Sequence, residues 1–184
     1  YGVMGAVWSM DTAGPISRTV EDCAIMLQAI AGHDPKDAYS QNVPVPDYRR
    51  SLSGDMRGLR VGALKERMET DLLDPEYRDT VLKATAVLGE LGGVVEEVSI
   101  PLTDHSGAIS WGIIATEWSA LYRDTFMSHL EELDHNNRIR FLSGSLLPAQ
   151  SYYKAQKLRS LVRQQVLAAL EQFDVLVLPT GTIP

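Results

Sequence analysis

The side chains that most often do chemistry are scattered along this chain without the spacing of a known site. The histidines are His33, His105, His129 and His135, and no two of them are four residues apart. With one cysteine in the chain, neither a zinc site nor an internal disulfide is expected. Cys23 has no flanking cation that would activate its thiol, so we expect it to be a small buried hydrophobic residue without a chemical role.

The run Ser143-Gly144-Ser145 has the composition of a nucleophile turn but lacks the G-x-S-x-G pattern, and no apolar strand leads into it. We therefore expect a solvated loop or the start of a helix there. No phosphate-binding loop and no G-x-G-x-x-G fingerprint in a strand–turn–helix frame occurs. Taken alone, the residues predict no catalytic group, no metal and no cofactor.

Composition limits the class of protein. The chain has 184 residues, of which 45% are apolar and 22% charged, as expected for a globular domain. The net charge of −7, without a basic run, argues against nucleic-acid binding. No stretch is long and apolar enough for a membrane span, and the lone cysteine suits a reducing cytoplasm. Because the chain starts at Tyr1 and not at Met, we expect an excerpt from a longer protein.

The first half of the chain predicts a helix followed by two strands around a second helix. Residues 19–31 have helical apolar spacing in Val20, Cys23, Ala24, Leu27, Ile30 and Ala31, and Thr19 with Asp22 resembles a capping box. Residues 33–58 are rich in turn formers and predict an extended surface excursion. Strands at 59–64 and 94–100 flank a helix that Asp74-Pro75 opens and Gly92-Gly93 closes, so the two strands should be parallel. The expected buried face of that helix is Tyr77, Val81, Leu82, Leu88 and Leu91.

The second half predicts two long helices and a strand. Residues 108–130 read as one helix, with a single aromatic face that packs into the core: Trp111, Trp118, Tyr122 and Phe126. After an irregular stretch at 135–137, residues 148–173 form the longest helix, with a stripe of Leu158, Leu161, Val162, Leu170 and Phe173. The apolar strand at 175–178 suits the middle of a parallel sheet. The polar loop at 179–182 would then lie at the carboxyl edge, where open α/β sheets bind ligands.

One segment carries a specific resemblance. Residues 9–22 read S-M-D-T-A-G-P-I-S-R-T-V-E-D and resemble the pattern S-x-D-x-x-G-P-x-x-R-[ST]-V-x-D of amidase signature enzymes. The likeness continues in the family's order through residues 27–34, 58–62, 92–98, 100–101, 140–144, 152–159 and 173–180, and is weakest at 103–137. The chain is identified as a member of that family.

The resemblance implies an α/β fold in which helices sandwich a mixed β-sheet, with residues 1–184 as a single incomplete domain. It also implies attack on a carboxamide by a serine that a second serine and a lysine activate. In the family these three groups precede the segment that Tyr1-Gly2 resembles, and no G-G-S run occurs here. We therefore expect no catalytic residue in this chain and no activity from it alone.

Supporting roles are what the resemblance transfers. Arg140 matches an arginine that binds a substrate carboxylate, although a plain helix-surface arginine remains an equal alternative. Thr180 and Thr182 match a wall of the substrate pocket. Asp11 matches a carboxylate that pairs with an arginine after the nucleophile and supports the nucleophile loop. Arg18 and Asp22 match structural partners around the helix start.

Three functions stay open at this point. The first is an amidase acting on a small-molecule amide, and the second is the glutamine-hydrolysing A subunit of a tRNA-dependent amidotransferase. The third is a noncatalytic α/β binding module. Partners would be copies of the same chain or the other amidotransferase subunits. The region around Arg140 is shorter than the amidotransferase pattern, which favours a general amidase.

Overall fold

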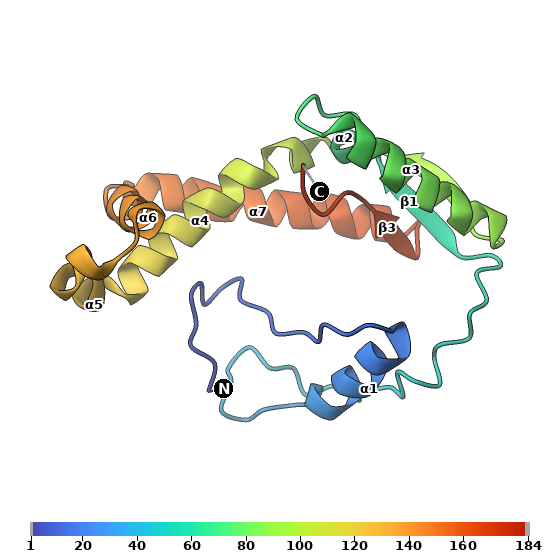
Figure 1. Ribbon diagram of the computed structural model, residues 1–184, viewed down its shortest axis with the longest axis horizontal. Coiled ribbons are helices and arrows are strands. Elements are labelled where there is room, and N and C mark those ends of the chain that lie inside the picture. The colour runs from blue at the N-terminus through green and yellow to red at the C-terminus, as the bar shows by residue number, and fades with distance from the viewer. Residues whose placement is uncertain (1, 183–184) are drawn as a thin grey trace. The chain divides into compact units, whose positions relative to one another are not determined.

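The computed structural model describes residues 2–182 and divides the chain into two compact units, Tyr1–Gly54 and Asp55–Pro184. Figure 1 shows the elements of both units. Within residues 2–182 no helix is long and apolar enough to cross a membrane. Whether residues 1–184 act as one incomplete domain stays a prediction.

Among its described residues, the first unit has one helix, α1, at Val20–Ile30, close to the predicted bounds. Thr19 caps it, because its side chain accepts a hydrogen bond from the Asp22 N–H group at 3.0 Å. The predicted apolar face is wrong in part: Val20 and Ile30 are 71% and 59% exposed, and Ala24 is the buried residue of the helix. The half-buried Cys23 forms no disulfide.

Residues 33–58 contain no helix or strand, as the turn-forming composition predicts. Aspartate side chains stabilise its turns: Asp34 and Asp37 each accept a bond from the N–H group two residues later, and Asp47 accepts one from Arg50. An ion pair at 2.7 Å joins Arg49 to Glu21 of α1, so the excursion is fastened to the helix.

The second unit contains a parallel three-stranded sheet in the order β2-β1-β3. Its strands are β1 at Arg60–Leu64, β2 at Val94–Val98 and β3 at Val175–Val177. The parallel pairing of β1 and β2 confirms the predicted strand–helix–strand unit. A Cβ atom on Gly62 would lie 2.8 Å from Leu176 and 2.9 Å from Val98, so the side chains of both outer strands fill the space over the central one.

The predicted central position of the apolar strand is wrong. Among the described residues β1 is central and β3 lies at the edge, with Val175 38% exposed. The physical reason is that β1 pairs with both neighbours, and its Val61 is fully buried. Arg60 and Asp174 hold the edge strand in place. The Asp174 N–H group donates to the Arg60 carbonyl, the Arg60 N–H group donates to the Asp174 carboxylate, and an ion pair at 2.7 Å joins the two side chains. The bonds from Arg60 lower the pKa of Asp174 to about 2.

Two helices follow β1. The first is α2 at Lys65–Met68, which the sequence did not predict, and the second is α3 at Pro75–Glu90. Asp74 caps α3 and Pro75 opens it, as predicted. The predicted buried face of α3 is wrong at Leu82 and Leu91, which are 45% and 56% exposed, whereas Thr85 is buried. Thr85 tolerates burial because its hydroxyl donates to the Val81 carbonyl at 2.8 Å.

The single helix predicted at 108–130 is broken in the structure. A 3₁₀ helix, η1 at Pro101–His105, leads into α4 at Ser106–Leu121. Then come α5 at Arg123–Ser128 and a second 3₁₀ helix, η2, at Leu130–Glu132. The chain turns at Tyr122, so that Phe126 packs on Trp118 with ring centroids 4.7 Å apart. Trp111, before the turn, is 43% exposed and not part of that aromatic core.

The stretch at 135–137, predicted to be irregular, instead begins a helix, α6, at His135–Ser145, and the run at 143–145, predicted as a solvated loop or the start of a helix, lies at the end of that helix. Asp134 caps it by accepting bonds from the Asn136 and Asn137 N–H groups. Gly144 lets α6 approach α4 closely, since a Cβ atom there would lie 2.3 Å from the Ala115 carbonyl oxygen.

The longest helix is α7 at Ala149–Leu170, after Pro148 and before β3. Its buried residues are the small Ala155 and Ala169, so it packs closely on its neighbours. The predicted leucine stripe is wrong at Leu161 and Leu170, which are 47% and 40% exposed. In Figure 1, α4 lies along α7, and α6 adjoins the end of this pair where α7 begins.

Candidate functional site

The carboxyl ends of the three parallel strands meet at one edge of the sheet, where α/β proteins bind their ligands. The chain leaves β1 through α2, leaves β2 through Ser99 and Ile100, and leaves β3 through the loop at 179–182. This carboxyl edge is therefore built from three segments that are far apart in the sequence.

The loop that follows β3 is held by the first turn of α3. The Thr180 N–H group donates to the Tyr77 hydroxyl at 3.3 Å, and the Asp74 N–H group donates to the Thr182 carbonyl at 2.8 Å. Thr180 is exposed and Thr182 half-buried. Sequence reasoning placed Tyr77 only on a buried helix face and missed this contact. The signal available in the sequence was that Tyr77 lies three residues after the cap Asp74 and therefore in the first turn of the helix.

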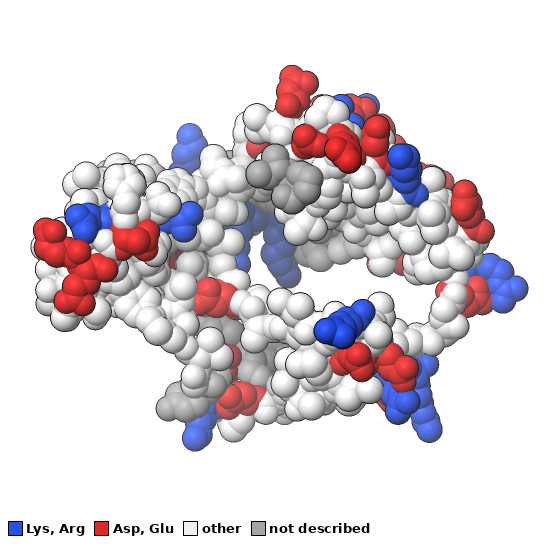
Figure 2. All heavy atoms as spheres, in the orientation of Figure 1, with Lys and Arg blue, Asp and Glu red and all other residues white. Residues whose placement is uncertain are grey.

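An open cavity of about 620 Å³ lies at the ends of β1 and β2, and carboxylates dominate its walls. Figure 2 shows acidic side chains gathered over α2 and α3. Glu66 accepts bonds from the Ser99 hydroxyl and, at 2.9 Å, from the Ile100 N–H group. Partial burial opposes the charged form of Glu66, but these bonds outweigh it and lower its pKa. Glu66 thus fixes the exit of β2.

A lysine balances part of this negative charge. Lys65 pairs with Glu97 at 3.2 Å, and the hydrogen bond to Glu97 raises the pKa of Lys65. Among residues 2–182 no group of three or more histidine, cysteine or acidic residues has the arrangement of a metal site. Four of the polar side chains that line the cavity are thus engaged in bonds at the edge of the sheet: Lys65, Glu66, Glu97 and Ser99.

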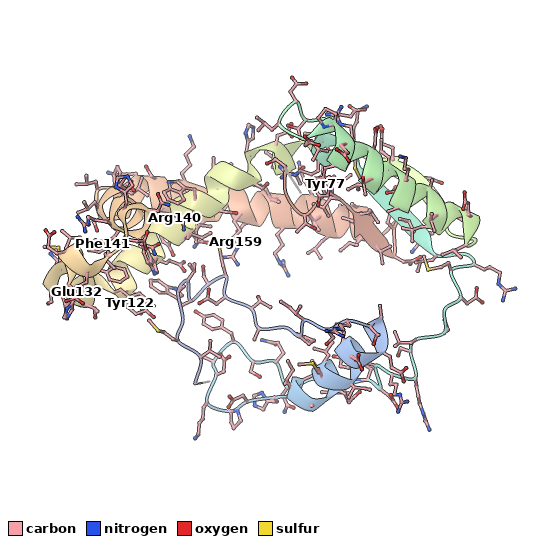
Figure 3. The ribbon with its side chains drawn as sticks, viewed as in Figure 1. Tyr77, Tyr122, Glu132, Arg140, Phe141 and Arg159 are labelled. Carbon is pink, nitrogen blue, oxygen red and sulfur yellow. The ribbon has the colours of Figure 1, made fainter. Side chains whose placement is uncertain are left out.

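Arg140 lies on α6 with an exposed side chain, and the adjacent Phe141 is buried in the aromatic core. Figure 3 shows both residues on α6. The Arg140 guanidinium makes no hydrogen bond or ion pair within the described part of the chain. The structure does not bring Arg140 into contact with Thr180 or Thr182, because α6 packs on α4 and the β3 exit packs on α3.

The serines of the run at 143–145 lie in α6 and donate to helix carbonyls. The Ser143 hydroxyl donates to the Ile139 carbonyl at 2.6 Å, and the Ser145 hydroxyl to the Phe141 carbonyl at 2.8 Å. Neither hydroxyl has a neighbouring base as hydrogen-bond acceptor within residues 2–182, which a serine nucleophile requires. The geometry favours a structural role for both.

Asp11, in the first unit, closes a backbone loop. Its Oδ2 atom accepts bonds from the N–H groups of Ala6 at 2.6 Å and Val7 at 2.9 Å. The resemblance gives Asp11 an arginine partner, and none of the six residues that follow it is basic. The structure adds local partners, the backbone N–H groups of Ala6 and Val7, which a search of the sequence for basic residues could not find.

Arg18 and Asp22 lie on either side of the Thr19 cap, both exposed. Within residues 2–182 no ion pair joins them. Asp22 adds negative charge to the first turn of α1, where the helix dipole favours it.

A buried polar network lies between α4 and α7. Glu117 is fully buried and accepts a bond from the Tyr152 hydroxyl at 2.9 Å and one from the Gln156 side-chain amide at 3.4 Å. Partial burial and the bond to Glu117 raise the pKa of Tyr152. Sequence reasoning missed this network because Glu117 occurs in an otherwise apolar helix.

Parallel strands joined through helices, with polar loops at their carboxyl edge, define an α/β protein. The family model described as Amidase matches residues 1–184. The chain therefore belongs to the amidase family, and the recognition made from residues 9–22 is confirmed.

Relatives of known name agree. An amidase of Pseudomonas putida is 39% identical over 183 residues, which are 100% of this chain and 39% of that protein. The A subunit of glutamyl-tRNA(Gln) amidotransferase from Gloeobacter violaceus is 37% identical over 205 residues, 98% of this chain and 42% of that protein. The chain thus spans about two fifths of the length of these relatives.

Solved structures share the fold. One comes from a vestigial protein complex that reveals the evolutionary origins of an s-triazine catabolic enzyme. It has a TM-score of 0.89 and 30% sequence identity, and the match covers 99% of this chain and 39% of that chain. Another is the glutamyl-tRNA(Gln) amidotransferase A subunit of Thermotoga maritima, with a TM-score of 0.79 and 28% identity over 100% and 40%. The predicted α/β class and amidase signature fold are confirmed.

Proposed function

We propose that this chain is the downstream part of a longer amide hydrolase, whose Ser-Ser-Lys triad lies in the segment before Tyr1. The observation that carries the proposal is the family match over residues 1–184 of a chain that spans two fifths of its relatives. The hydrogen bonds that Ser143 and Ser145 donate to helix carbonyls support an upstream nucleophile.

The proposed reaction needs no cofactor. The nucleophilic serine loses its proton through the bridging serine to the lysine and bonds to the carboxamide carbon. The carbon–nitrogen bond then breaks, and the proton leaves with the amine as ammonia. Water hydrolyses the remaining ester to the carboxylic acid and restores the serine. Backbone N–H groups stabilise the oxyanion in both steps.

In this proposal the chain binds the substrate and supports the triad. The exposed guanidinium of Arg140, which is unpaired within residues 2–182, suits a bidentate bond to a substrate carboxylate. Thr180 and Thr182 form a pocket wall at the carboxyl edge of the sheet. Asp11, whose Oδ2 atom already orders the loop before it, pairs through its other oxygen with an arginine after the nucleophile.

Ammonia release tests the proposal. The full-length enzyme should release ammonia from aliphatic or aromatic carboxamides, whereas the 184-residue chain alone should release none. Turnover by the isolated chain would place the chemistry inside it and refute the proposal. No turnover by a folded full-length protein, with or without the other amidotransferase subunits, would favour a noncatalytic α/β binding module.

The A subunit of a tRNA-dependent amidotransferase is the second candidate, because several relatives carry that name. Alignment length favours the amidase. The match to the Pseudomonas putida amidase spans 183 positions, whereas the matches to two of the A subunits span 205 and 208, more than the 184 residues here. These subunits therefore contain residues for which this chain has no counterpart. Glutamine hydrolysis that requires partner subunits and misacylated tRNA would reverse this preference.

A further inference from the structure

The loop after β3 needs partners from outside the sheet. Pairing between β3 and β1 ends at Val177, so the backbone polar groups beyond it are not satisfied by a neighbouring strand among residues 2–182. The Thr180 N–H group finds the Tyr77 hydroxyl, and the Thr182 carbonyl finds the Asp74 N–H group. These two contacts lie on either side of Gly181 and hold the loop against α3.

The turn that supplies these contacts is itself fixed. The Asp74 carboxylate accepts a bond from the Tyr77 N–H group at 3.0 Å, and Pro75 restricts the backbone between them. Arg78 donates to the Thr70 carbonyl at 2.8 Å, which fixes the segment before the turn. Figure 3 shows Tyr77 beside the chain that follows β3. The hydroxyl is therefore presented from a rigid support.

The two contacts differ in kind. The bond between Asp74 and Thr182 joins backbone atoms, so almost any residue at either position would keep it. The bond to Thr180 depends on a side-chain hydroxyl that reaches a residue 103 positions later. Phenylalanine would fill the same half-buried space without making that bond. The hydroxyl of Tyr77 thus has a separable effect on the loop.

We propose that Tyr77 is a positioning residue for the substrate, whose hydroxyl holds the Thr180 backbone and so shapes the wall at residues 180–182. The inference rests on the proposed function, in which that wall bounds the substrate pocket. Gly181 gives the loop several accessible conformations, and the hydroxyl favours one of them. When the binding-competent loop is less populated, apparent substrate affinity falls by the same fraction.

The test is Tyr77→Phe in the full-length enzyme. We expect KM for a carboxamide to rise about 2- to 10-fold, the factor that one hydrogen bond between neutral groups supports, with kcat within about twofold of wild type. Hydrogen exchange of the peptide covering residues 178–182, followed by mass spectrometry, should become faster. Tyr153→Phe is the matched control, since Tyr153 is 67% exposed on α7, and it should change neither quantity.

Each outcome decides a specific point. Wild-type KM and wild-type exchange in Tyr77→Phe would overturn the inference, as would a loss of thermal stability with KM unchanged. If the wild-type enzyme hydrolyses no carboxamide, the proposed function fails. In that case faster exchange in Tyr77→Phe would still support the loop contact, while the substrate role would be lost with the function.

Discussion

Gly144→Ala should weaken the contact between α4 and α6. A Cβ atom at this position would lie 2.3 Å from both the Ala115 carbonyl oxygen and the Ser119 hydroxyl oxygen. The hydroxyl can rotate away, but the carbonyl belongs to the backbone of α4, so the helices must move apart. The Ser119 hydroxyl also donates to the Phe141 carbonyl at 3.1 Å, and that bond would be disturbed.

The size of the effect follows from two opposing contributions. Overpacking against a rigid backbone costs about 3 kcal/mol, the upper part of the usual range for an added methyl group. Alanine in a helix regains up to about 1 kcal/mol relative to glycine. The net loss of unfolding free energy is therefore about 2 kcal/mol, which lowers the urea midpoint by about 1 M for a slope of ~2 kcal/mol/M.

Urea unfolding followed by tryptophan fluorescence measures this loss, because Trp118 packs in the aromatic core beside α6. Gly107→Ala is the matched control: Gly107 lies in α4, and nothing comes within 4 Å of the added Cβ atom. We expect this control to be as stable as wild type or slightly more so. Equal midpoints for Gly144→Ala and Gly107→Ala would refute the close helix approach.

Three further predictions concern charged residues. In the full-length enzyme, Arg140→Met should lower kcat/KM for carboxylate-bearing amides about 10- to 150-fold and leave kcat/KM for neutral amides unchanged. Arg163→Met, at an exposed position of α7, is the control. Equal losses on both classes of substrate would make Arg140 a structural residue. Asp11→Asn should lower both the melting temperature and kcat. A neutral amide oxygen accepts the Ala6 and Val7 hydrogen bonds more weakly than a carboxylate, and the proposed ion pair with an arginine is lost. Wild-type values for both quantities would show that Asp11 is only a turn residue. The pKa of Asp174 is lowered from 3.8 to about 2, so its contribution to stability is present above pH 3.8 and lost as the pH falls towards 2. Asp174→Asn should therefore flatten the dependence of the urea midpoint on pH in that window, and an unchanged slope would contradict the pairing with Arg60.

Local signals predicted the starts of helices best. Thr19 and Asp74-Pro75 were identified from residue types within one turn, and the structure confirms both caps. The parallel pairing of β1 and β2 followed from the predicted strand–helix–strand pattern, although the structure has the short α2 in addition to α3 between them. These features depend on neighbours in the sequence, which is why the sequence alone was sufficient.

Features that depend on distant residues were missed or misjudged. The helix α6 has no clear apolar period, and its close contact through Gly144 with α4 could not be read from its own residues. The contact between Tyr77 and Thr180 joins residues 103 positions apart. For the same reason the edge position of β3 was missed, since an apolar run indicates burial but not which strand is central.

Labelling with a fluorophosphonate, which reacts covalently with activated serines, tests most directly whether the nucleophile lies upstream of this chain. The full-length enzyme would be labelled, digested and mapped by mass spectrometry, with loss of amide hydrolysis followed in parallel. We predict one modified serine in the segment before Tyr1 and complete loss of ammonia release, while Ser143→Ala and Ser145→Ala enzymes keep wild-type labelling and turnover. A label on Ser143, Ser145 or any other serine of this chain, with loss of activity, would contradict the proposed function.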